Sequence, residues 1–138
     1  NYTTADEVRG AMEDFFRLHT ASSPEKASYM TADRKAFFVE MATELADRGM
    51  LVLSLLELDG KRVAACITFD YLDGYLLYNS GYDPDYSELS VGLINTALTI
   101  RNAIEAGKAS FDFLRGTERY KYHLGAEDRS VYMATIRR

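Results

Sequence analysis

The stretch from Met50 to Tyr82 reads MLVLSLLELDGKRVAACITFDYLDGYLLYNSGY, in which long apolar runs are separated by two Asp-Gly pairs. Asp-Gly between apolar runs is a strong signal for a two-residue hairpin turn, because these residues adopt positive φ at little cost. The stretch therefore predicts a three-stranded antiparallel meander, with strands over 50–58, 62–71 and 75–82 and turns at Asp59-Gly60 and Asp73-Gly74.

Two helices are predicted before the meander. Thr4 followed by acids up to Glu7 is typical of a helix beginning, because side-chain oxygens and negative charge stabilise that end. Apolar residues then recur at helical spacing as far as His19, and a second helix is predicted over residues 31–49. Residues 21–30 contain serines and a proline and show no period, so we interpret them as a loop.

The segment after the meander is expected to return to the sheet. It comprises a loop, a helix, a strand, a short helix and a final strand, over residues 83–89, 90–107, 110–114, 117–123 and 130–136. The apolar stripe of the first helix is expected to contain Leu93, Ala97, Ile100 and Ile104. A helix between the third and fourth strands indicates a parallel crossover. The predicted fold class is therefore α/β (α+β), with an antiparallel meander joined to a parallel crossover in one mixed sheet and helices on both faces.

Composition limits the classes of function. The chain has 138 residues, which suits one domain, and a formal net charge of −5. An acidic balance argues against a broad nucleic-acid surface and against electrostatic membrane binding, and no apolar run is long enough to span a bilayer. The single cysteine, Cys66, lies among apolar residues and is expected to be buried rather than nucleophilic. His19 and His123 lack ligand spacing, so no metal site is predicted.

The junction between the third strand and the next helix is the first candidate site. A helix that begins near Ser90 exposes backbone N–H groups, and Gly92 lets a phosphate approach them. An ordinary capped helix explains the same residues, and the nearby acids Asp83, Asp85 and Glu88 would repel a phosphate unless they point away. The candidate binding residues are Tyr78, Asn79, Ser80, Gly81, Ser90, Val91 and Gly92.

The second candidate is the stretch from Ser110 to Ala126, SFDFLRGTERYKYHLGA, in which a short strand leads into a run of titratable groups. Asp112 could orient or deprotonate an incoming amine, and Lys121 could stabilise developing negative charge. The phenols of Tyr120 and Tyr122 could protonate a leaving group. An edge strand followed by a solvated helix explains these residues equally well.

Several motifs along the chain resemble those of one family. FDFLRG at 111–116, followed by ERYKYHLGA at 118–126, is similar to the C-terminal signature of GNAT-superfamily acetyltransferases related to the cellulose-biosynthesis CelD/BcsL group. That group is in turn similar to the FemAB-type aminoacyltransferases. YNSGYDP at 78–84, SVG at 90–92 and FRLH at 16–19 also resemble family segments, so the resemblance extends over nearly the whole chain.

The resemblance implies a GNAT-like fold with acetyl-CoA, or another acyl-CoA, as co-substrate. The pyrophosphate would bind the N–H groups at the helix start around Gly92, and the pantetheine would run along residues 78–81. The general acid would be Tyr120 or Tyr122, and Lys121 would neutralise charge near the substrate.

The reaction implied by the resemblance is direct transfer of the acyl group to an amine of a sugar, an amino acid or a cell-envelope precursor, in the cytoplasm. The alternative is a non-catalytic GNAT-like half that serves as a substrate-docking or interaction module for a partner domain. Family members typically carry two GNAT-like halves, so we expect an N-terminal half, carrying the first strand of the fold, to precede this chain. No nucleic-acid partner is expected, although aminoacyl-tRNA stays open as a donor.

Overall fold

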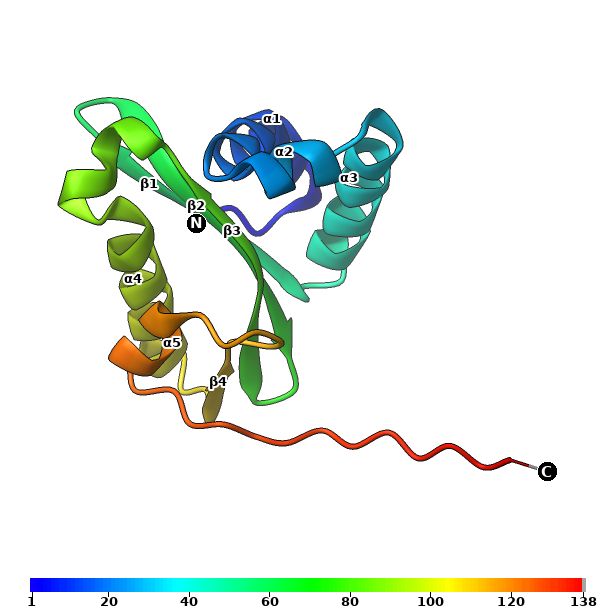
Figure 1. Cartoon of the computed structure of the whole chain (residues 1–138). Helices are drawn as coiled ribbons and strands as arrows, with labels where there is room; N and C mark the ends of the chain where they lie inside the picture. Colours follow the sequence, from blue (N-terminus) through cyan, green and yellow to red (C-terminus); the bar gives the residue numbers. More distant parts are fainter. Residues whose placement is uncertain (138) are drawn as a thin grey trace.

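The computed structural model describes residues 1–137 and contains a four-stranded mixed sheet with helices on both faces (Figure 1). The strands, in sheet order, are β1 (Leu51–Leu58), β2 (Lys61–Tyr71), β3 (Gly74–Tyr82) and β4 (Ser110–Asp112). The first three pair antiparallel, as the meander predicts, and β4 pairs parallel with β3. The predicted fold class is therefore confirmed.

The two hairpin turns differ in their use of glycine. In the first, Asp59 and Gly60 both have positive φ, of 50° and 75°, as a two-residue turn of the predicted kind requires. In the second, Tyr71 pairs with Gly74, so the turn residues are Leu72 and Asp73, one position earlier than predicted. Gly74 lies in β3, where a Cβ would approach the Ser110 hydroxyl of β4 to 2.8 Å. This glycine therefore permits close parallel pairing rather than the turn.

The helices form two layers on opposite faces of the sheet (Figure 1). One layer contains α1 (Ala5–Ala21), α2 (Pro24–Tyr29) and α3 (Ala32–Asp47), and the other contains η1 (Pro84–Leu89), α4 (Val91–Glu105) and α5 (Arg119–His123). The predicted beginning of α1 is confirmed by a capping box between Thr4 and Glu7. Within residues 1–137, none of the helices is long and apolar enough to cross a membrane.

The main hydrophobic core lies between the sheet and the layer of α1 and α3. Phe15 on α1 and Phe38 on α3 are both almost fully buried, and their rings stack with centroids 6.3 Å apart. Phe38 also stacks on Tyr78 of β3, with ring centroids 5.8 Å apart. The core cluster further includes Val8, Met12, Leu18, Leu51, Leu53 and Ile67.

The predicted apolar stripe of α4 is wrong. Leu93 and Ile104 are exposed, and the buried residues of this helix are Val91, Asn95, Thr96, Thr99 and Ala103. The polar side chains are accommodated because Asn95 donates to the sulfur of Cys66 on β2 at 3.3 Å and Thr99 donates to a carbonyl of its own helix. Satisfied polar groups can be buried at little cost, so hydrophobic periodicity pointed to the wrong face.

Two predicted elements differ from the structure. Residues 21–30 contain α2, a short helix with Ser23 as N-cap and Pro24 in its first turn. The final strand predicted over residues 130–136 is absent among residues 1–137, where this segment is extended and its apolar side chains are exposed. Strand formation depends on a neighbouring strand, and within the described residues this segment has none.

The first strand of the fold is expected in a half that precedes this chain. Within residues 1–137, the segment before α1 forms one isolated β-bridge. Tyr2 pairs antiparallel with Leu53 of β1 through two backbone hydrogen bonds of 2.9 and 3.0 Å. The start of the chain is thereby tied to the outer edge of the sheet.

Candidate active site

The strands β3 and β4 run together for only a short distance. Their pairing covers Gly74–Leu76 and Ser110–Asp112. Immediately beyond it, β3 contains a bulge, because Leu77 pairs with Thr68 and Asn79 with Ile67, which leaves Tyr78 as an extra residue. A bulge bends its strand, and among the described residues the edge of β3 that faces β4 has no strand partner past this point.

Two cavities open along this free edge of β3. The first, which we call the helix cavity, has a volume of about 330 Å³ and lies between the end of β3 and the start of α4. The second, the strand cavity, has a volume of about 290 Å³ and lies between β3 and the loop after β4. Lys26, Ser80 and Tyr120 line both cavities. The two cavities therefore meet at these three residues.

The start of α4 forms one wall of the helix cavity. Ser90 has a left-handed conformation and makes no side-chain cap, and its own N–H is bonded to the Ser87 carbonyl at 2.9 Å. The first N–H groups of a helix have no partner within it, so the amides available here are those of the turn that begins at Val91 and Gly92. Asp83, Asp85 and Glu88 are not among the residues that line this cavity.

The two glycines predicted to bind the co-substrate have different surroundings. A Cβ at Gly81 would lie 2.3 Å from the backbone nitrogen of His19, so this glycine allows α1 to pack closely on β3. A Cβ at Gly92 would lie 3.2 Å from the Tyr82 ring, which itself lines the helix cavity. Both glycines still line the helix cavity with their backbone.

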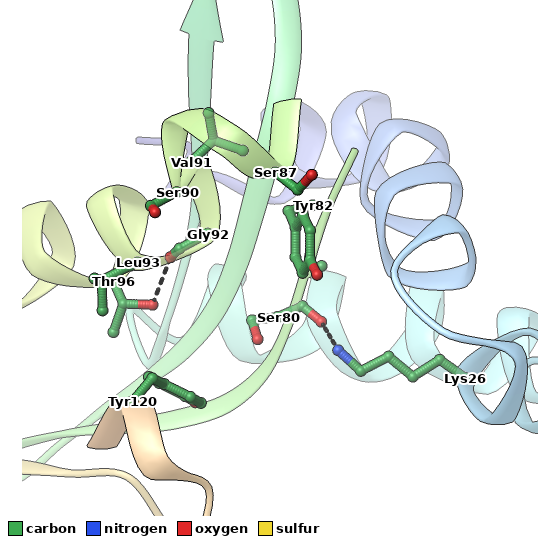
Figure 2. Close-up of a pocket in the computed structure, with 11 residues that line it drawn as sticks. Lys26, Ser80, Tyr82, Ser87, Ser90, Val91, Gly92, Leu93, Thr96 and Tyr120 are labelled. Atoms are coloured by element: carbon green, nitrogen blue, oxygen red, sulfur yellow. Dashed lines mark hydrogen bonds between the residues drawn. The ribbon is translucent and has the colours of Figure 1, made fainter. Parts of the chain in front are cut away.

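Tyr120, on α5, lies where the two cavities meet. Figure 2 shows its side chain across the cavity from the start of α4 and near Ser80. Burial raises the pKa of this phenol to about 12, and the neighbouring acidic groups Glu118 and Cys66 contribute in the same direction. The phenol is therefore protonated throughout the neutral range, which is the state that a proton donor requires.

The other predicted catalytic residues are not brought to the same point. Lys121 is buried and its ammonium is occupied, because it pairs with Glu118 at 2.8 Å and donates to the carbonyls of Arg115 and Gly116. These contacts fix the loop that borders the strand cavity. The exposed Asp112 accepts the N–H of Leu114 at 2.6 Å, and the exposed Tyr122 donates to Asp128 at 2.8 Å. Neither Asp112 nor Tyr122 lines either of these two cavities.

Lys26 lines both cavities but is not among the site residues predicted from the sequence. This residue belongs to α2, and its ammonium donates to the Ser80 carbonyl at 2.7 Å (Figure 2). Burial lowers the pKa of Lys26, against the opposing influence of Cys66 and Glu118. A Ser-Pro pair at positions 23 and 24 is a helix-start signal, and it would have placed Lys26 on a short helix.

A buried histidine supports the strand at the same place. Nε2 of His19 lies 3.2 Å from the side-chain oxygen of Asn79. Burial and the neighbouring charge of Lys26 lower the pKa of this histidine, so the neutral ring is favoured. The side chain of Tyr78 belongs to the core, stacked on Phe69 with ring centroids 4.7 Å apart. Tyr78 and Asn79 therefore line the strand cavity from a rigidly held strand.

Comparison with known proteins assigns this architecture to a family. Residues 2–122 match the acetyltransferase (GNAT) domain, so the chain belongs to the GNAT acetyltransferases. It is therefore an enzyme of the class that transfers an acetyl group from acetyl-CoA as co-substrate. No curated protein sequence matches the chain.

Solved structures show the same fold at low sequence identity. The ribosomal-protein-S18-alanine N-acetyltransferase from Escherichia coli superimposes with a TM-score of 0.68 at 18% identity, covering 86% of this chain and 73% of that one. An aminoglycoside 6'-N-acetyltransferase from Acinetobacter haemolyticus gives a TM-score of 0.63 at 13% identity, covering 94% of both chains. A related acetyltransferase bound to a bisubstrate analogue gives 0.65 at 15% identity, covering 94% of this chain and 92% of that one.

Proposed function

We propose that this domain transfers an acetyl group from acetyl-CoA to the amine of a small acceptor, which is a sugar, an amino acid or a cell-envelope precursor. The observation that carries the proposal is the meeting of two cavities at Ser80 and Tyr120. Two reactants can enter from different sides and react at one point, and such positioning supplies a large part of the rate enhancement. The motif resemblance further supports a relationship to the CelD/BcsL and FemAB groups and a preceding GNAT-like half.

In this proposal acetyl-CoA occupies the helix cavity. Its pyrophosphate accepts hydrogen bonds from the amides of Val91 and Gly92, at the positive end of a helix of 15 residues. Its pantetheine runs beside Ser80 and Gly81, along the edge of β3 that has no strand partner. The thioester then lies near the phenol of Tyr120.

The acceptor amine occupies the strand cavity and attacks the thioester carbonyl carbon. A C–N bond forms, the C–S bond breaks, and Tyr120 donates its proton to the leaving sulfur. The proton of the attacking nitrogen passes to water. Asp112 and Lys121 act in this proposal as positioning residues, because each holds part of the backbone between β4 and α5.

Thermal unfolding with and without acetyl-CoA tests the binding step. A ligand at about one hundred times its Kd stabilises the folded state by about 2.7 kcal/mol, so the wild-type Tm should rise by several degrees. Gly92→Val should abolish the rise, because the added side chain crowds the Tyr82 ring, which lines the helix cavity. The matched control is Gly10→Val on α1, where a Cβ meets no atom within 4 Å; it should keep the full rise.

The same measurement separates the enzyme from the docking module. A module that binds no CoA would show no Tm rise at millimolar acetyl-CoA in the wild type. An unchanged rise in Gly92→Val would instead remove the pyrophosphate from the start of α4 while leaving the enzyme interpretation in place.

A further inference from the structure

The strand cavity is positively charged although the whole chain is acidic. The charged residues that line it are Lys26, Arg115, Glu118 and Lys121, so three cations face one carboxylate. The formal net charge of the chain is −5, so this local excess of cations is opposite in sign to the rest of the protein. A cleft lined by one sign of charge concentrates ligands of the opposite sign.

The single carboxylate in the cavity is already neutralised. Glu118 lies 2.8 Å from the ammonium of Lys121, and this hydrogen bond is the main reason why the pKa of Glu118 is lowered. Among residues 1–137, Lys26 and Arg115 form no ion pair. Two cations therefore remain to meet whatever enters the strand cavity.

Lys26 is held in place for such a contact. Its ammonium carries three donors, and within residues 1–137 the one protein acceptor it meets is the Ser80 carbonyl, at 2.7 Å. The other two donors remain for a ligand. A partly buried cation without a counter-ion is costly, and an anionic group bound beside it would offset that cost.

We propose that the natural acceptor is a small amine that also carries an anionic group, a carboxylate or a phosphate, which binds Lys26 and Arg115 in the strand cavity. This inference rests on the proposed function, because it identifies the chemical class of the acceptor. Binding of the anion at Lys26 places the amine of the same molecule beside Tyr120, since both residues line the place where the cavities meet.

Size and charge restrict the acceptor further. A volume of about 290 Å³ is at the lower end of the range for ligand pockets, about 300–1,000 Å³, so a single sugar or amino acid fits better than a polymer. A polycationic amine would meet Lys26 and Arg115 with charge of the same sign. Such amines are therefore expected to be poor acceptors.

Matched pairs of acceptors test this inference. The phosphate arm compares glucosamine 6-phosphate with glucosamine, the carboxylate arm compares alanine with alaninamide, and kanamycin serves as the polycation. In at least one arm the anionic member should have a kcat/KM about tenfold or more above its neutral partner, as expected for charge-assisted hydrogen bonds. The arm that shows the preference identifies the anion.

Lys26→Gln shows whether the preference comes from this cavity. The variant should reduce the kcat/KM ratio between anionic and neutral acceptors to near one when acetyl-CoA is saturating, a condition that removes any effect of Lys26 on the helix cavity, which it also lines. The matched control is Lys61→Gln, which removes the same charge from an exposed position outside both cavities and should leave the ratio unchanged.

Several results would overturn the inference. One is a higher kcat/KM for neutral or polycationic acceptors, and another is that none of the anionic probes is acetylated. A third is that Lys26→Gln lowers kcat/KM equally for both members of a pair. A protein that binds acetyl-CoA and acetylates neutral amines refutes the anionic acceptor alone. Absence of acetyl-CoA binding to the wild type refutes the proposed function itself.

Discussion

The two faces of the sheet are built from different kinds of side chain. The face covered by α1 and α3 carries a continuous aromatic and aliphatic core in which Phe15 and Phe38 are almost fully buried. The face covered by α4 has only small apolar clusters, and the helix buries Asn95, Thr96 and Thr99 instead. Burial of apolar area dominates stability, so the first face supplies most of it, and the second can carry polar residues such as Thr96, which lines the helix cavity.

The polar face of α4 also explains why Cys66 is present. The thiol accepts from Asn95 at 3.3 Å and lies beside Thr96, and burial raises its pKa to about 11. A neutral thiol is a small, weakly polar group, so it suits an interface between a strand and polar side chains. The contrast between the faces predicts that substitutions on the face covered by α1 and α3 affect folding. Substitutions near the face covered by α4 are expected to affect activity.

The largest effect is expected for Phe15→Ala. Removal of a buried aromatic ring from the α1 face should lower the free energy of unfolding by about 3–5 kcal/mol, because Phe15 contacts both Phe16 and Phe38. Chemical denaturation followed by circular dichroism measures this loss. The fraction that remains folded should bind acetyl-CoA with unchanged affinity, and a large loss of affinity in that fraction would show that the two faces are coupled.

Gly81→Ala should be the next largest effect on folding. The added Cβ would lie 2.3–2.5 Å from the backbone of Leu18 and His19, and a helix backbone cannot rotate away as a side chain can. Overpacking of this kind costs about 1–3 kcal/mol. Denaturation measures it, and a variant as stable as the wild type would mean that α1 is not pressed against β3.

Tyr120→Phe should act on chemistry and leave folding nearly intact. Loss of a general acid lowers kcat by about a hundredfold, whereas the Kd for acetyl-CoA from calorimetry should stay within about twofold. Tyr122→Phe, outside both cavities, should keep wild-type kcat. Equal losses in the two variants would contradict the assignment of the acid to Tyr120.

The pH dependence of kcat in the wild type also tests the assignment of the general acid to Tyr120. The folded pKa of Tyr120 is raised to about 12 from an ordinary value of 10.0, so the acid is fully protonated below pH 10 and is lost only as pH rises through about 12. An alkaline fall in kcat should therefore be absent up to about pH 10. Because the folded pKa of Tyr120 lies above its unfolded pKa, its contribution to the free energy of unfolding is fully present below the unfolded pKa. That contribution is lost as pH rises through the folded pKa.

The smallest effect is expected for Ile104→Lys. Hydrophobic periodicity places this residue in the apolar stripe of α4, but it is 69% exposed in the structure. An exposed substitution changes the free energy of unfolding by less than about 0.5 kcal/mol. A loss of several kcal/mol in denaturation would show that α4 packs with the face that the sequence pattern predicts.

Elements that depend on local interactions could be predicted from the sequence, whereas elements that depend on contacts with distant segments could not. The meander was predictable because Asp59-Gly60 and its counterpart at position 73 are local turn signals. The start of α4 was predictable for the same reason. The final strand failed because residues 130–136 have strand-like side chains, but pairing is a property of the neighbour and not of the segment.

The candidate site was less predictable than the fold. Tyr120 and the start of α4 come from motifs that can be read along the chain, and both line a cavity. Lys26 reaches Ser80 from 54 positions away in sequence, so only the fold brings it there. Lys121 illustrates the converse, since its charge and position fit a catalytic role while its ammonium is used to hold the loop after β4.

The bulge in β3 lets two consecutive side chains, Tyr78 and Asn79, face the same helical layer, toward Phe38 and His19. Regular strands alternate their side chains, so Tyr78 is a supernumerary residue inserted without disturbing the alternation before or after it. A chain shortened by this residue could keep the other cross-strand partners, but it would lose both the bend and the stacking of Tyr78 on Phe38 and Phe69. One inserted residue therefore connects the bend beside the opening between β3 and β4 to the packing of the main core.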